Sequence, residues 1–127
     1  GISVALTEML RRDKALGARI DLSPADINVF LTLASDDDRT LRVYAGEFLH
    51  DLGSPMVAKA AIERAAALGK SAAMDNARFN LIFIAQNGWK DLPPATRKQL
   101  APQIETIRRD SRGKDRTLEL LKKLPAF

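Results

Sequence analysis

The stretch from Arg39 to Gly69, RTLRVYAGEFLHDLGSPMVAKAAIERAAALG, predicts two amphipathic helices joined by a tight corner at residues 53–55. In its first half, apolar residues recur at steps of three and four: Leu41, Tyr44, Ala45, Phe48, Leu49 and Leu52. The second half is rich in alanine, and such small side chains let two helix axes approach closely. A helical hairpin of this kind exposes an apolar face that a neighbouring hairpin must cover. We therefore expect an all-α fold of stacked antiparallel helical hairpins.

Capping residues set the expected helix boundaries. Serine accepts a hydrogen bond at a helix N-cap and proline suits the first helical position, so Ser23-Pro24 and Ser54-Pro55 mark helix starts, as does Ser71. Glycine can take the positive φ that closes a last turn, and five glycines follow apolar periodic segments: Gly17, Gly53, Gly69, Gly88 and Gly113. The sequence therefore predicts about seven helices, at residues 2–16, 24–34, 38–52, 55–68, 72–87, 94–110 and 114–124.

Two local features refine this pattern. Pro102 lacks an amide hydrogen and would clash with the preceding turn, so we expect segment 94–110 to be a short helix to about Leu100 followed by a second helix from Ala101. The acidic run Asp36–Asp38 precedes the third predicted helix, where carboxylates favour the helix dipole. It lacks the ligand spacing of a calcium loop, so we interpret it as a cap.

The fifth predicted helix is the expected centre of the fold. Apolar residues surround its second half, from Phe79 to Ala85, as in a helix covered by others on every side. Each large side chain buried there contributes about 1.5–3 kcal/mol, so Phe83→Asp is predicted to abolish folding. Trp89 follows Gly88, and we expect it to pack back over the last turn from outside the helix.

Composition limits the possible classes of protein. The chain has 127 residues, is 46% hydrophobic and carries a formal charge of +4, which fits a single domain of residues 1–127. It contains no cysteine, which excludes disulfides, thiolate metal sites and cysteine nucleophiles. It begins with Gly1 inside a helical pattern, without the features of a signal peptide, so we expect a piece of a longer protein. Both a cytoplasmic and a periplasmic location are compatible with this composition.

The residues of the central hairpin resemble a tetratricopeptide repeat. Ala45 and Gly46 fall at the Leu-Gly pair of that family's first helix and Gly53 at its turn, while Ala58, Ile62 and Ala65 fall at packing positions of the second helix. The pattern departs from the family at Arg42, Leu49 and Lys70, which replace its Trp, Tyr and closing Pro. The resemblance covers about half of the chain and implies a right-handed superhelix of helical hairpins.

This resemblance also implies a concave surface that holds a peptide or a partner's tail. On the central repeat, the corresponding positions form a partner-binding face: Thr40, Val43, Glu47, His50 and Asp51. The equivalent face of the fifth helix is apolar, and we expect the C-terminal helices to cover it: Met74, Ala77, Leu81, Ile84 and Ala85.

A basic run near the C-terminal end is the candidate anion-binding segment. It contains five cations: Arg108, Arg109, Arg112, Lys114 and Arg116. These side chains could bind phosphates or an anionic lipid surface, although Asp110 and Asp115 dilute their charge. The run lacks interleaved aromatic residues for base stacking, so nucleic acid is not the favoured partner, and a solvated helix junction is the alternative.

Catalysis and metal binding find little support in the sequence. His50 is the only histidine and follows Glu47 by three residues, which is half of a helical di-metal motif whose other half is absent. The isolated glycines do not form a phosphate-binding loop. We expect no cofactor, no metal and no catalytic residues, and we interpret His50 as a surface or capping residue.

Three functions remain open from the sequence. The first is a non-catalytic interaction or accessory domain of a larger, bacterial-looking protein, with a protein or peptide as partner. The second is the extracytoplasmic C-terminal domain of a membrane-bound envelope or glycan-assembly protein. The third is a nucleic-acid-binding helical domain. Oligomeric state is not predicted.

Overall fold

The computed structural model describes residues 22–124, and every regular element in this range is helical. The elements are α2 (Pro24–Leu33), α3 (Arg39–Leu52), α4 (Pro55–Ala66), the 3₁₀ turn η2 (Ala72–Met74), α5 (Asp75–Trp89), α6 (Pro94–Gln99), α7 (Ala101–Asp110) and α8 (Asp115–Leu121). No strand occurs within residues 22–124. The predicted all-α class is confirmed, whereas the predicted helix 2–16 and its stop at Gly17 lie outside the described residues.

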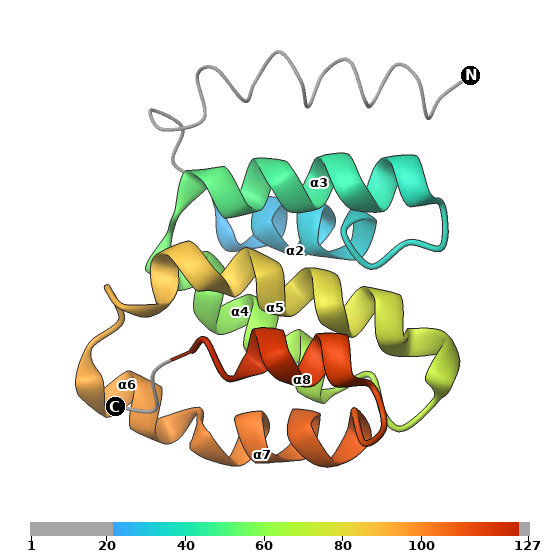
Figure 1. Cartoon of the computed structure of the whole chain (residues 1–127). Coiled ribbons are helices and arrows are strands. Elements are labelled where there is room, and N and C mark those ends of the chain that lie inside the picture. Colours follow the sequence, from blue (N-terminus) through green and yellow to red (C-terminus); the bar gives the residue numbers. More distant parts are fainter. Residues whose placement is uncertain (1–21, 125–127) are drawn as a thin grey trace.

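The helices form a two-layer stack (Figure 1). One layer contains α3, α5 and α8 side by side, and the other contains α2, α4 and α7. Each helix of one layer pairs with its chain neighbour in the other, as α2 with α3, α4 with α5 and α7 with α8. Because neighbours along the chain run in opposite directions, the connections 67–74 and 111–114 lie at the same end of the stack. The predicted stacking of antiparallel hairpins is confirmed.

Side-chain caps explain where most of these helices begin. Ser23 accepts a hydrogen bond from the Asp26 amide at 3.1 Å, while the Asp26 carboxylate accepts from the Ser23 amide, which completes a capping box. Asp38 caps α3 by accepting from the Leu41 amide at 3.1 Å, so the acidic run is a cap as predicted. Ser54 caps α4 and Ser71 caps η2 in the same way. The predicted break before Pro102 is also confirmed, because α6 ends at Gln99 and α7 begins at Ala101.

Three of the glycines that were predicted to end helices have positive φ, namely Gly53 (60°), Gly69 (80°) and Gly113 (83°). The prediction for Gly88 was wrong, because α5 continues through Gly88 to Trp89, which is 2% exposed. Instead, the absence of a side chain at Gly88 lets α5 approach the backbone of Ser54 and Pro55 closely. A Cβ atom there would lie 2.7 Å from the carbonyl carbon of Ser54, at the turn between α3 and α4. Trp89 therefore belongs to the helix and is not an external staple.

The core lies between α4 and α5, and α5 has the most buried residues of the described helices. Leu81, Ile82 and Ile84 are at most 1% exposed, which confirms the central position predicted for this helix. Phe79 and Phe83, however, are only half-buried, so the other elements do not cover α5 on every side. Because Ile82 is 0% exposed and Phe83 is half-buried, we expect a carboxylate at Ile82 to destabilise the fold more than Phe83→Asp.

Three faces of α5 contact three different helices. Toward α3, the Asn80 amide donates to the carbonyl oxygens of Ala34 at 2.8 Å and Arg42 at 2.9 Å. Toward α8, the Gln86 amide donates to the Leu120 carbonyl oxygen at 3.0 Å. The face that includes Leu81 and Gly88 is directed at the start of α4, because Gly88 approaches Ser54 there. On the apolar face expected to be covered by the C-terminal helices, Ala77, Leu81, Ile84 and Ala85 are buried and Met74 is half-buried. The approach of Gly88 to Ser54 places the start of α4, and not a C-terminal helix, against the end of this face.

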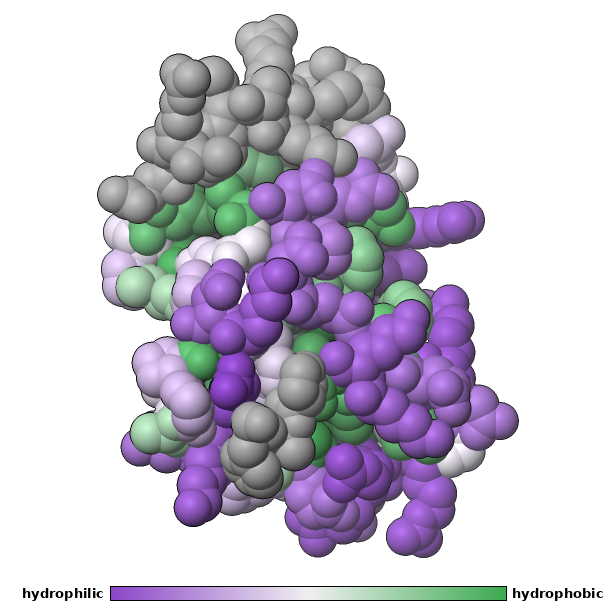
Figure 2. Space-filling view, turned by 60° about the vertical axis from the view of Figure 1, so that its left-hand side comes forward, coloured by the Kyte–Doolittle hydropathy of each residue, from purple (hydrophilic) through white to green (hydrophobic). Residues whose placement is uncertain are grey.

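Hydrophilic residues cover much of the described surface at the end where α3 turns into α4 (Figure 2). Within residues 22–124, the large hydrophobic side chains that are exposed are Val29, Val43 and Met56. No helix in this range is both long enough and apolar enough to cross a membrane.

Candidate anion-binding site

The cations of the basic run do not form one patch. Arg109 and Arg112 line a common cavity at the end of α7, whereas Arg108 lines a different groove. Arg116 turns back onto α5, where its guanidinium carbon lies 4.1 Å from the centre of the Phe79 ring. The Lys114 side chain is exposed and forms no hydrogen bond or ion pair within residues 22–124, although the backbone of Lys114 bonds to Ser111 and Leu118. Of the five predicted anion-binding residues, the structure therefore brings two together.

A third cation joins those two from a distant part of the chain. The cavity has a volume of about 580 Å³ and is lined by Lys70, Thr106, Arg109, Asp110 and Arg112. We call these five residues the cationic pocket. Lys70 belongs to the connection between α4 and α5, whereas the other four belong to α7 and to the connection that follows it. The sequence did not single out Lys70 as a ligand, because this connection has no basic run of its own.

The cations of the pocket are not neutralised by neighbouring carboxylates. Elsewhere, Lys59 pairs with Glu63 at 3.1 Å and Lys122 with Glu119 at 3.2 Å. By contrast, Lys70, Arg109 and Arg112 form no ion pair in the described chain, although Asp110 lines the same cavity. Arg109 makes one weak contact, from Nη2 to the Thr106 hydroxyl at 3.5 Å. Their charges are therefore available to an external anion.

A buried arginine holds the connection that carries Lys70. Arg78 on α5 is 1% exposed, and its guanidinium donates to the carbonyl oxygens of Gly69 at 2.6 Å and Ser71 at 3.1 Å. These two carbonyl groups flank Lys70 on either side. Hydrogen bonds from a buried charged donor are stronger than neutral ones, so the backbone at Lys70 is held in place.

The other connection at the pocket is held through the start of α8. The Thr117 hydroxyl, which is fully buried, donates to the Asp75 carboxylate at 2.9 Å, and Arg78 Nη2 lies 3.9 Å from the same carboxylate. Arg116 Nη2 also donates to Asn76 at 3.4 Å. The chain is therefore bonded to α5 just after the loop that carries Arg112. Within this loop, Gly113 has a φ of 83°, which reverses the chain direction. One connection at the pocket is thus bonded to α5 directly, and the other leads into a helix whose first turn is bonded to α5.

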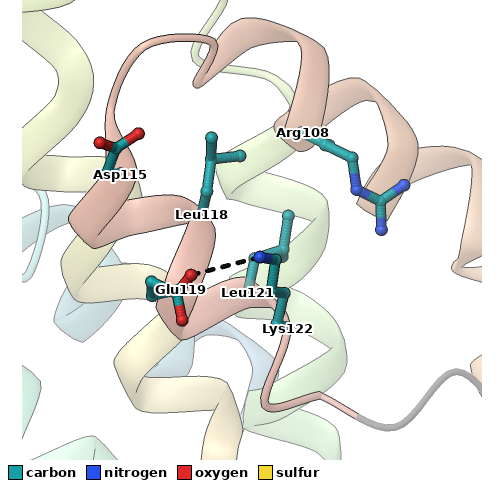
Figure 3. Close-up of a pocket in the computed structure, with 6 residues that line it drawn as sticks. All are labelled: Arg108, Asp115, Leu118, Glu119, Leu121 and Lys122. Atoms are coloured by element: carbon teal, nitrogen blue, oxygen red, sulfur yellow. Dashed lines mark hydrogen bonds and ion pairs between the residues drawn. The ribbon is translucent and has the colours of Figure 1, made fainter.

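Arg108 occupies a different environment. It lines a groove of about 330 Å³ between α7 and α8, together with Asp115, Leu118, Glu119, Leu121 and Lys122 (Figure 3). Figure 3 shows the Arg108 side chain extending away from the other five residues. Its guanidinium pairs with Glu105 on its own helix. Because this groove contains two cations and two carboxylates, it does not favour an anion.

The predicted partner-binding face on α3 has mixed exposure. Thr40 and Asp51 are exposed, and Val43 is 37% exposed. Glu47 is half-buried, and both Glu47 and Asp51 interact with other residues of the chain. This face therefore offers Thr40 and Val43 most clearly to a partner.

His50, the fifth predicted member of that face, joins α3 to α5. Its ring stacks on Phe83 with centroids 4.0 Å apart and planes 1° from parallel. The Asn87 amide donates to the His50 carbonyl oxygen at 2.9 Å and points at Nδ1 at 3.2 Å. Asp51 Oδ1 also lies 3.5 Å from Nδ1 of the same ring. The contacts of His50 are those of a helix-packing residue.

Within residues 22–124, no group of three or more His, Asp or Glu side chains is placed to hold a metal ion. Comparison with protein-family models, curated proteins and solved structures finds no significant match to this chain.

Proposed function

We propose that this chain is a non-catalytic protein-interaction domain, and that its cationic pocket binds an acidic segment of a partner protein. One observation carries this proposal: three cations from two distant parts of the chain line one cavity, and none of them has an ion pair within residues 22–124. Uncompensated charge is costly to assemble unless an anion balances it, because like charges repel within a Debye length of about 10 Å.

The distribution of charge along the chain also favours the cationic pocket as the binding surface. Residues 94–124 carry nine Lys and Arg against four Asp and Glu, whereas residues 22–93 carry seven against nine. The C-terminal third thus supplies the positive field that attracts an acidic partner and raises its association rate. We favour the pocket over the α3 face because His50 is engaged in helix packing and Glu47 has a partner within the chain.

Within this proposal, the architecture is that of a degenerate tetratricopeptide-like stack. The residues that match the family's packing positions are all buried: Ala45, Gly46, Ala58, Ile62 and Ala65. Gly53 has the positive φ that the family's turn requires. Stacks of this kind serve as scaffolds that present a surface to another protein.

The test is binding of a fluorescently labelled oligo-glutamate peptide at low salt, measured by anisotropy. We expect saturable binding that weakens as salt is added and falls about tenfold in Arg109→Ala/Arg112→Ala, which corresponds to about 1.4 kcal/mol for two cations. The matched control is Lys98→Ala/Lys123→Ala, which removes the same charge from two exposed lysines outside the pocket.

Two outcomes would overturn the proposal. Equal losses in both double variants would mean that net charge alone attracts the peptide, and the pocket would have no role. Tighter, salt-sensitive binding of duplex DNA than of the peptide, abolished by Arg109→Ala/Arg112→Ala, would assign the pocket to nucleic acid instead. Thermal melting of each variant, followed by circular dichroism, checks that it is folded.

A further inference from the structure

We propose that the group held in the cationic pocket is a phosphomonoester on the partner segment, such as a phosphorylated serine or threonine. This inference rests on the proposed function, since it names the chemistry of the acidic group that the pocket accepts. It goes beyond that function because an ordinary acidic peptide would present only carboxylates.

The charge balance of the pocket favours a dianion. Lys70, Arg109 and Arg112 contribute three positive charges and Asp110 contributes one negative charge, which leaves an excess of two. A phosphomonoester carries about −1.5 to −2 near neutral pH, whereas one carboxylate or one phosphodiester carries −1. A single phosphomonoester therefore balances the pocket, and a single glutamate or one nucleic-acid phosphate does not.

The donors of the pocket also suit phosphate. Two guanidinium groups present planar pairs of N–H donors, which bind phosphate oxygens in the bidentate manner. Lys70 adds a charged donor from the other connection, 67–74, so the donors of the cavity come from two separate segments of the chain. The weak contact between Arg109 and Thr106, at 3.5 Å, leaves most of that guanidinium's hydrogen-bonding capacity unused.

The size of the cavity is compatible with a phosphorylated segment. Its volume of about 580 Å³ lies in the range of pockets that hold drug-sized ligands, about 300–1,000 Å³. A lone phosphate ion would fill only part of this space, and a phosphorylated side chain with its adjoining backbone would fill more. The hydrogen bonds from Arg78 hold the connection that carries Lys70 before binding, and the bond from Thr117 holds the start of α8, which follows the connection that carries Arg112. This order lowers the entropic cost of forming the site.

The experiment compares three labelled peptides that differ at one position, which is phosphoserine, glutamate or serine. The remaining positions are identical and mildly acidic. We expect the phosphopeptide to bind about tenfold more tightly than the glutamate peptide, because charge-assisted hydrogen bonds to phosphate are stronger and more numerous. Arg109→Ala/Arg112→Ala should abolish this preference, and the control Lys98→Ala/Lys123→Ala should retain it.

The outcomes separate this inference from the proposed function. Equal affinity for the phosphoserine and glutamate peptides, with both dependent on Arg109 and Arg112, would overturn the phosphate inference and leave the proposed function standing. Absence of binding by all three peptides would overturn both. Inorganic phosphate that competes at the concentration of the phosphopeptide would show that the pocket takes the free ion. A single-stranded oligonucleotide that binds more tightly than the phosphopeptide would assign it to phosphodiesters.

Discussion

The α4–α5 pair and the α6–α8 segment are both helical, but different interactions hold them in the fold. In α4 and α5, five of twelve and eight of fifteen residues are buried. In α7 and α8, one of ten and two of seven are buried, and α6 has none. The first region is specified by packing, since a residue there has neighbours on most sides. The second has a large exposed surface whose side chains can change without loss of the fold, and this is where the excess positive charge lies.

The difference shows which side chains are available for binding. In the packed region, even polar residues have structural roles, as Asn80 bonds two carbonyl groups of the α2–α3 hairpin and Arg78 bonds two of a loop. In the α6–α8 segment, Arg109 and Arg112 make no ion pair with any residue that the structure describes. Unused hydrogen-bonding and charge capacity is therefore concentrated in the region that contributes least to the core.

The largest expected effect tests the packing of α5. Ile82→Asp places a carboxylate at a site that is 0% exposed, and we expect a loss of at least about 4 kcal/mol in the free energy of unfolding. Phe83→Asp should cost about 1–3 kcal/mol, because this ring is half-buried. Leu118→Asp on α8, which is also half-buried, is the control from the other region. Urea denaturation followed by circular dichroism measures all three.

If Leu118→Asp destabilised the protein as much as Ile82→Asp, the two regions would depend on packing equally, and the comparison would fail. A cooperative, native-like transition in Ile82→Asp would show that α5 is not central.

The next largest expected effect is the loss of stability on substituting two glycines, Gly88 and Gly113. Gly88→Ala places a Cβ 2.7 Å from the Ser54 carbonyl carbon and 3.1 Å from the Pro55 nitrogen, both backbone atoms, and should cost about 1–3 kcal/mol. Gly113→Ala meets no atom within 4 Å but strains a φ of 83°, at about 1–2 kcal/mol. Asparagine tolerates positive φ, so Gly113→Asn should recover stability and Gly88→Asn should not. Thermal melts of the four variants decide this, and recovery by Gly88→Asn would refute the close-approach explanation.

Much of the helical pattern could be predicted because it depends on local chemistry. Ser23, Asp38 and Ser54 cap helices through residues three positions away, and Pro102 acts on its own turn. Gly88 was misassigned because its role depends on Ser54, which is remote in sequence and adjacent only after folding. The local sequence pattern cannot distinguish a glycine that ends a helix from one that lets a distant segment of backbone pack closely against the helix.

The site was predictable only in part, for the same reason. The basic run identified Arg109 and Arg112, but adjacent residues on a helix point in different directions, so Arg108 faces another groove. Lys70 reaches the pocket because α4 and α7 run in the same direction and end side by side.

The smallest expected effect compares pairwise coupling in the two regions. A Cβ on Gly46 would lie 2.5 Å from Asn80 Oδ1, so Gly46→Ala should displace Asn80 and cost about 1–2 kcal/mol. In an Asn80→Ala background the same change should cost nothing, because the obstructing amide is gone and alanine is the better helix former. A double-mutant cycle should therefore give a coupling of about 1 kcal/mol or more. The matched cycle on Glu105 and Arg108, an exposed ion pair, should give less than about 1 kcal/mol. Additive Gly46 and Asn80 changes, or equal coupling in both cycles, would mean that polar residues of the packed region are no more constrained than those at the surface.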